Sequence, residues 1–312
     1  MLFLPLERWI LIVITLLFCG SCFVLWLDGV AFALDRIGAC LIAGAVPIAI
    51  GLFYRVSGRS DRIALAAVST GLFILFTLAG SIFNYVFLPI AFPPIDPFLI
   101  RIDAMLGYDW ATTVTFAATH PWIGHVLFFV YSSSLLQLVF LNCWFGFRGD
   151  ATQLHLMMLS GMIAFAFAMV IWVLFPSFGA LSYANLPGWV EQTIPVAGGT
   201  AYGRELLRIA ADGPDVIDPS QMIGLIAFPS FHTVMACMSL AFAPRVLPLR
   251  LFFYGLNLLM FPAVLVQGGH HLVDIGGGIA VFLVARMCAE RLIVVTQTLR
   301  PRFDGRLASR QL

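Results

Sequence analysis

The chain has 312 residues, of which 61% are hydrophobic and 11% charged, and its formal net charge is +1. A typical soluble domain carries about 25% charged residues, so this composition excludes a soluble globule and indicates an all-α integral membrane protein. A net charge this close to zero provides no basic field of the kind that binds nucleic acid.

Eight apolar segments are candidate spans, since a helix needs about 20 mostly apolar residues to cross a bilayer. In chain order they cover residues 9–27, 37–54, 63–88, 121–145, 152–175, 229–244, 251–268 and 271–290. We therefore expect a multi-span helical bundle in which residues 1–62 hold two N-terminal spans and residues 63–299 hold a core of six. Residues 300–312 form a basic tail that we expect to rest on anionic headgroups.

The arginines orient these spans, because cytoplasmic loops carry an excess of positive residues. All 17 cations of the chain are arginine. One side of the expected bundle holds Arg8, Arg55, Arg59, Arg62, Arg148, Arg245, Arg250, Arg286, Arg291, Arg300, Arg302, Arg306 and Arg310. The other side holds Arg36, Arg101, Arg204 and Arg208. This bias predicts that both termini are cytoplasmic and that the ends carrying residues 92–118 and 176–227 face outward.

These two outer segments are not simple spans. Residues 92–118 begin with Pro93-Pro94 and mix apolar with charged residues, which favours a helix lying in the membrane interface. Residues 176–227 form the longest polar stretch, and an ordered loop of that length is usually functional or a lid.

His270 and Asp274 lie four residues apart where one apolar stretch gives way to the next. On a helix this spacing places an imidazole and a carboxylate on one face. A carboxylate beside a histidine fixes its tautomer and makes the other ring nitrogen a better nucleophile. The pair is therefore a candidate catalytic nucleophile with its orienting group.

A third candidate, His232, occurs in Phe228-Pro229-Ser230-Phe231-His232, also at the mouth of an apolar run. The 37 residues between His232 and His270 suffice for two short crossings, which would bring both histidines to the outer face. The free backbone N–H groups of a helix starting near Ser230, and its hydroxyl, could hold an anion. This set suits a phosphate ester that His270 attacks at phosphorus while His232 protonates the leaving oxygen.

These residues resemble the last two motifs of the phosphatidic acid phosphatase type 2 superfamily, which is related to the vanadium haloperoxidases. Pro229-Ser230-Phe231-His232 is similar to its Pro-Ser-x-His motif, and His270 with Asp274 is similar to its final motif. The resemblance implies a six-helix membrane phosphatase core, a phosphohistidine mechanism and no metal or other cofactor. The form His270-His271-Leu272-Val273-Asp274 resembles the branch of inositol phosphorylceramide synthase and the sphingomyelin synthases. The Phe-Pro-Ser-Phe-His form resembles bacterial members, so we expect a bacterial inner membrane with the site facing the periplasm.

The chain departs from the family pattern in its phosphate-binding cations. The first family motif needs a lysine, which this chain lacks, and Val264 stands where an arginine usually precedes the nucleophile by six residues. Arg208 is the substitute we expect to bind phosphate, with Arg204 next and Arg101 third.

Several functions remain open from the sequence. A lipid phosphate or lipid diphosphate phosphatase would use water as acceptor, and a headgroup transferase of the inositol phosphorylceramide synthase type would use an alcohol. A transporter without hydrolase activity is a different class, since ionisable residues at membrane depth often mark ion pathways. A metal site built from His232, His270, His271 and Asp274 is a further alternative. The sequence indicates no oligomeric state.

Overall fold

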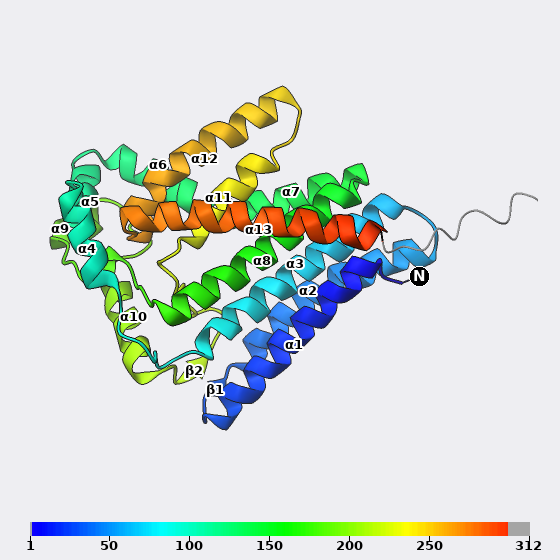
Figure 1. Cartoon of the computed structure of the whole chain (residues 1–312), viewed down its shortest axis with the longest axis horizontal. Coiled ribbons are helices and arrows are strands. Elements are labelled where there is room, and N and C mark those ends of the chain that lie inside the picture. The colour runs from blue at the N-terminus through cyan, green and yellow to red at the C-terminus, as the bar shows by residue number, and fades with distance from the viewer. Residues whose placement is uncertain (1, 299–312) are drawn as a thin grey trace, which may run out of the picture.

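A computed structural model describes residues 2–298 and shows a bundle made almost entirely of helices (Figure 1). The predicted basic tail, 300–312, lies outside the described residues. The long helices are α1 (Pro5–Leu27), α2 (Leu34–Val56), α3 (Asp61–Tyr85), α8 (Ala151–Leu174), α12 (Leu247–Gly268) and α13 (Leu272–Thr298). The shorter helices are α4 (Asp96–Met105), α5 (Trp110–Thr119), α6 (Pro121–Ser132), α7 (Ser134–Arg148), α9 (Gly188–Thr193), α10 (Thr200–Asp212), α11 (Phe231–Ala241) and the 3-10 turn η1 (Ala180–Ser182). The prediction of an all-α multi-span membrane fold is confirmed.

Among the described residues, six helices are long and apolar enough to cross a bilayer, namely α1, α2, α3, α8, α12 and α13. Helices α6 and α7 bend by 43° at their junction and make a seventh crossing if the pair is counted as one broken span. The hydroxyls of Ser133 and Ser134 each donate to a carbonyl three residues back, at 2.6 and 2.5 Å. Such serines at a helix junction are a recognised cause of kinks.

The sixth predicted span in chain order, 229–244, is shorter than expected. Its helix, α11, begins at Phe231 and ends at Ala241, so its 11 residues cover about 17 Å of a hydrocarbon layer about 30 Å thick. The apolar residues before it form no helix and are bonded to α3 and to the segment that follows α8. The N–H of Ile223 donates to the hydroxyl of Tyr85 at 2.8 Å, and the N–H of Ala227 donates to the carbonyl of Ser177 at 3.1 Å.

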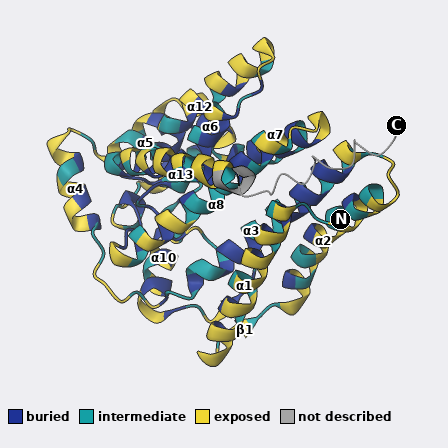
Figure 2. Ribbon diagram, turned by 45° about the vertical axis from the view of Figure 1, so that its right-hand side comes forward, coloured by how far each residue is buried: buried dark blue, intermediate teal, exposed yellow. Residues whose placement is uncertain are grey.

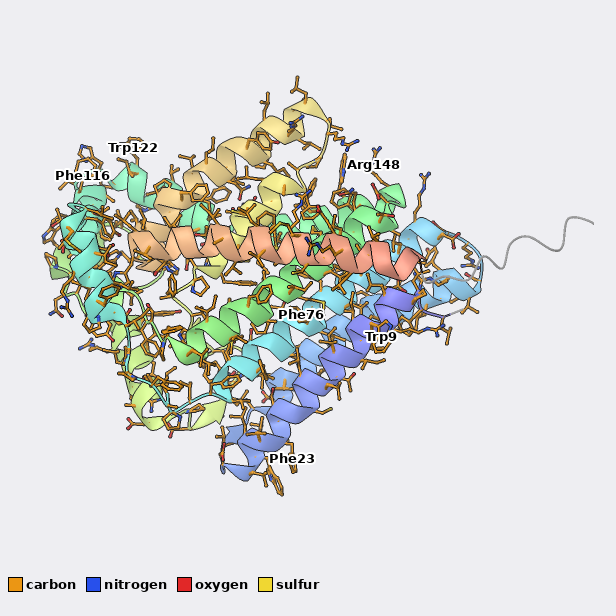
Figure 3. The ribbon with its side chains drawn as sticks, viewed as in Figure 1. Trp9, Phe23, Phe76, Phe116, Trp122 and Arg148 are labelled. Atoms are coloured by element: carbon orange, nitrogen blue, oxygen red, sulfur yellow. The ribbon has the colours of Figure 1, made fainter. Side chains whose placement is uncertain are left out.

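Helices α1 and α2 form an N-terminal hairpin against α3. In the most apolar 18-residue stretch of each helix, 22% of the residues of α1 and 17% of those of α2 are buried, against 56% for α3. The hairpin therefore mostly faces lipid and α3 is an inner helix (Figure 2). The exposed Trp9 and Phe23 of α1 extend outward from it (Figure 3). A buried ion pair closes one end, where Arg55 Nη1 lies 2.6 Å from Glu7 Oε2.

The non-spanning helices α4, α5, α9 and α10 gather at the end of the molecule opposite the N-terminus (Figure 1). The predicted interfacial segment, 92–118, is thus two short helices rather than one, since Gly107 with φ 73° ends the first. Residues 176–227, called the outer loop below, are joined to the N-terminal hairpin by strands β1 (Ala31–Phe32) and β2 (Val216–Ile217), which pair in parallel. An ion pair between Arg36 and Asp218 lies beside them.

Candidate active site

The connection between α12 and α13 carries the candidate nucleophile. Helix α12 ends at Gly268, and Gly269 adopts the left-handed conformation (φ 65°) that glycine accepts without strain. A Cβ on Gly269 would also lie 2.1 Å from Leu181, so this position has no room for a side chain. The chain then places His270 just before α13 and Asp274 in its first turn.

His270 and Asp274 meet as predicted, although His270 precedes the helix instead of lying on it. Nδ1 of His270 lies 3.0 Å from Oδ2 of Asp274, and both side chains are buried. The same carboxylate oxygen accepts the backbone N–H of His271 at 2.9 Å. With Nδ1 held by the carboxylate, Nε2 is the ring nitrogen that remains free to react.

Helix α11 brings the second motif against this pair. Ser230 is its N-cap, and the Ser230 hydroxyl accepts the N–H of Thr233 at 3.3 Å and lies 3.5 Å from Nε2 of His270. The backbone N–H of Ser230 donates to the carbonyl of Asp274 at 3.1 Å. Gly278 of α13 permits this close approach of α11 to α13, because a Cβ on Gly278 would lie 2.5 Å from the carbonyl oxygen of Ser230.

His232 faces the same cavity as His270. This cavity has a volume of about 260 Å³, and both histidines line it together with Tyr131 and Tyr202. The ring of His232 stacks on Tyr131 with centroids 4.0 Å apart, which fixes its orientation. The four predicted residues His270, Asp274, His232 and Ser230 are therefore brought together by the fold.

The outer loop forms one wall of the cavity. Leu181, Gly198, Tyr202, Leu206 and Gly224 line it from this loop. The N–H of Gly198 donates to the carbonyl of Gln267 at 2.9 Å, which holds the loop onto the end of α12. The loop that the sequence marked as functional or a lid thus contributes residues to the His270 cavity.

A model of the PAP2 superfamily matches residues 97–288, which is more than half of the chain and includes both motifs. The chain belongs to the PAP2 superfamily. This membership supports phosphatase-type activity on lipid phosphates in general, in a protein embedded in the membrane. No curated protein and no solved structure gave a significant match to the chain.

The arginines that we expected to bind phosphate lie elsewhere in this PAP2 protein. Arg208 forms ion pairs with Glu205 at 2.7 Å and Asp215 at 3.3 Å, and it lines a separate polar cavity of about 110 Å³. Arg204 and Arg101 are exposed, and Arg101 donates to the carbonyl of Pro97 at 3.2 Å. None of the described residues that line the His270 cavity is an arginine. Sequence reasoning could not detect this, because the positions depend on how the outer loop folds.

A second cavity of about 340 Å³ adjoins the first and is mostly apolar. Side chains from α3, α7, α8 and α11 line it, and His232, Gly224 and Ile226 line both cavities. Phe76 of α3, labelled in Figure 3, packs edge-on against Phe165 of α8 at 5.7 Å in its wall. The candidate proton donor thus lies where a polar and an apolar cavity meet.

The sequence did not indicate the role of His271. Its ring is buried between two carboxylates of α4, with Nδ1 2.6 Å from Asp103 Oδ2 and Nε2 3.3 Å from Asp96 Oδ1. Burial opposes a charge on this ring, but the hydrogen bonds and charges of Asp96, Asp274 and Asp103 outweigh it and raise the pKa of His271. The one available signal was the seven-residue spacing of Asp96 and Asp103, which places both on one face of a helix.

The alternative metal site is not assembled. His270 and His271 turn to different carboxylates, and the described residues contain no group of three or more histidine, cysteine or acidic side chains placed to hold a metal ion.

Proposed function

We propose that this protein is a lipid phosphatase or phosphotransferase that works through a phosphohistidine at the outer face of the membrane. Nε2 of His270 attacks phosphorus and forms a P–N bond as the P–O bond to the leaving group breaks. The negative charge of a bound phosphate favours the protonated form of His232, which gives its proton to the leaving oxygen. Asp274 accepts the Nδ1–H of His270 and offsets the positive charge that develops on the ring.

The second half of the reaction reverses these roles. An acceptor hydroxyl loses its proton to His232, and its oxygen attacks phosphorus as the P–N bond breaks. The phosphate leaves joined to the acceptor, and both histidines return to their starting states. Water as acceptor makes the protein a phosphatase, and an alcohol makes it a phosphotransferase.

The observation that carries this proposal is the 3.0 Å contact of His270 with Asp274, together with the Ser230 hydroxyl 3.5 Å from the opposite ring nitrogen. An anion beside Nε2 would meet this hydroxyl and the N-terminus of α11, which both favour negative charge. A bound lipid that excludes water from the cavity would strengthen these interactions.

A specific observation favours headgroup transfer as a second candidate. A phosphate monoester carries up to two negative charges, whereas a phosphodiester carries one. Desolvating a doubly charged group without a paired cation is costly, and the described residues lining the His270 cavity include no arginine. A donor lipid with a phosphodiester headgroup therefore suits the cavity better than a monoester or a diphosphate.

The apolar cavity supports a lipid substrate over a soluble one. It meets the polar cavity at His232, so a leaving group protonated by that residue would lie at its entrance. An alkyl chain placed there is removed from water, which contributes about 0.8 kcal/mol for each buried CH₂ group. The arginine bias favours an orientation with this entrance on the outer side, and the resemblance of Phe228–His232 to bacterial members makes that side the periplasm.

Incubation of the purified protein with a panel of lipids tests the proposal. The panel contains dioctanoyl phosphatidic acid, an isoprenyl diphosphate and dioctanoyl phosphatidylinositol, with and without a lipid alcohol, and products are read by mass. Acid-labile, base-stable phosphate on His270 would support the phosphohistidine. Binding of these lipids without any turnover or phosphorylation would contradict the proposal and favour the transporter alternative.

A further inference from the structure

The buried ring of His271 links α4 to the segment between α12 and α13 that carries His270. Its two nitrogens face Asp103 at 2.6 Å and Asp96 at 3.3 Å, and the ring is fully buried. A histidine that meets a carboxylate at each nitrogen can donate at both only as an imidazolium. His271 therefore serves as a bridge between two acids and is not available to a substrate.

Asp103 holds the backbone as well as the ring. While Oδ2 faces His271, Oδ1 accepts the N–H of Leu272 at 3.1 Å. Leu272 is the first residue of α13, where N–H groups have no partner inside the helix. Asp274 accepts the neighbouring N–H of His271 at 2.9 Å. Two carboxylates from different helices thus fix the backbone on the C-terminal side of His270.

Asp96 holds a second segment in the same place. Its carboxylate accepts the hydroxyl of Ser177 at 2.8 Å and the N–H groups of Phe178 and Gly179 at 3.0 and 2.8 Å. Gly179 in turn packs against the segment between α12 and α13, since a Cβ on Gly179 would lie 2.5 Å from the carbonyl oxygen of Gly269. Asp96 therefore joins the start of the outer loop to the turn that precedes His270.

We propose that Asp103, Asp96 and His271 are positioning residues that set the attack angle of His270, a role that rests on the proposed function. None of the three lines the cavity that holds His270 or the adjoining apolar cavity, so they act through the backbone of residues 269–272. Helix α4 is then more than an interfacial anchor, because its inward face carries both acids that hold the nucleophile in place.

The test compares Asp103→Ala with Asp103→Asn. Alanine removes both acceptors, while asparagine keeps an oxygen for the Leu272 N–H but cannot hold His271 as an imidazolium. We expect Asp103→Ala to slow phosphorylation of His270 about tenfold to a hundredfold, because a small displacement of a nucleophile has an effect of that size. KM for dioctanoyl phosphatidic acid or dioctanoyl phosphatidylinositol, whichever the wild type turns over, should change by less than about twofold. Asp103→Asn should recover part of the rate.

Glu7→Gln is the matched control, since Glu7 is also a buried carboxylate in a charged pair but lies at the opposite end of the bundle. It should lower the melting temperature without changing the phosphorylation rate. The proposal is overturned if Asp103→Ala forms phosphohistidine at the wild-type rate, or if KM rises while kcat is kept.

Two further outcomes are decisive. If Asp103→Ala fails to fold, Asp103→Asn and His271→Gln take its place. A folded variant with a wild-type rate then overturns the proposal, and a folded variant with a reduced rate supports it. Absence of phosphohistidine in the wild type itself would instead contradict the proposed function, so the two failures are distinguishable.

Discussion

The imidazole of His270 and the carboxylate of Asp274 lie 3.0 Å apart in a site that leaves 5% and 0% of their side chains exposed. Burial of this kind makes the pair interdependent. An aspartate without its histidine would be a buried charge that has lost its imidazole partner, and a histidine without its aspartate would lose the group that selects its tautomer.

We expect His270→Ala and Asp274→Asn each to lower kcat by about four orders of magnitude, since loss of the orienting carboxylate in a comparable triad has an effect of that size. The double variant should be little worse than either single variant, because the residues act as a unit. Turnover measured on the lipid that the wild type uses provides the check. His125→Ala, an exposed histidine of α6, is the control that should keep full activity. Wild-type turnover by His270→Ala would refute the assignment.

Arg208→Ala tests the cation that the sequence pointed to. In the structure Arg208 is exposed and paired with Glu205 and Asp215 outside the His270 cavity, so we expect kcat/KM to stay within about twofold of wild type. Arg204→Ala should behave in the same way. A loss of tenfold or more in Arg208→Ala alone would mean that the outer loop rearranges on substrate binding and delivers this arginine to phosphate.

Gly161→Leu tests whether the apolar cavity holds an alkyl chain. A Cβ at Gly161 would lie 3.0 Å from the Met238 side chain in the cavity wall, so leucine would fill part of the space. We expect kcat/KM to fall by about tenfold or more for long-chain lipids and to change little for dioctanoyl lipids. Gly20→Leu is the control, because nothing lies within 4 Å of a Cβ at Gly20. Equal losses for both chain lengths would argue against an alkyl chain in this cavity.

Single cysteines test the orientation in the membrane. In a background without the six native cysteines, Gln192→Cys lies in the outer loop and Ser57→Cys lies between α2 and α3, and both positions are exposed. An impermeant thiol reagent should label Gln192→Cys in intact cells and Ser57→Cys only after lysis. The opposite pattern would place the site in the cytoplasm.

The raised pKa of His271 predicts a pH effect on stability. Asp96 and Asp103 face the ring from α4, Asp274 faces it from α13, and His270 precedes it. Because the folded state favours the protonated ring, this stabilisation is fully present below the ordinary pKa of 6.5 and is lost as pH rises through the raised value. The melting temperature in detergent should therefore decline above about pH 6.5. His271→Gln should be less stable and show a flatter profile; an identical slope would contradict the assignment.

The membrane fold was predictable because hydropathy alone identifies segments of about 20 apolar residues. The predicted span 229–244 shows the limit of that signal. Its helix covers only Phe231–Ala241, and the apolar residues just before it form no helix, since their backbone N–H groups bond to Tyr85, Tyr202 and Ser177. Hydropathy measures burial and cannot distinguish a buried helix from a buried extended chain.

The site was predictable where partners are close in sequence. His270 and Asp274 are only four residues apart, so they meet at the start of α13 even though His270 precedes the helix. The partners of His271 are 168 and 175 residues away, so only the three-dimensional structure reveals them. The same holds for Arg208, whose position beside Asp215 depends on how the outer loop folds.

The contacts of the N-terminal hairpin determine where the chain could be cut into two separate fragments. The family match begins at residue 97, yet α3 lies before it and supplies a wall of the apolar cavity. Helices α2 and α3 are in backbone contact, because a Cβ on Gly71 would lie 2.4 Å from the carbonyl of Gly44. Strands β1 and β2 join the other end of the hairpin to the outer loop. The region shared with the family therefore lacks a helix that forms a wall of the apolar cavity. A cut between Ser57 and Ser60 would separate two complete sets of helices, which could reassemble when expressed together as a split enzyme.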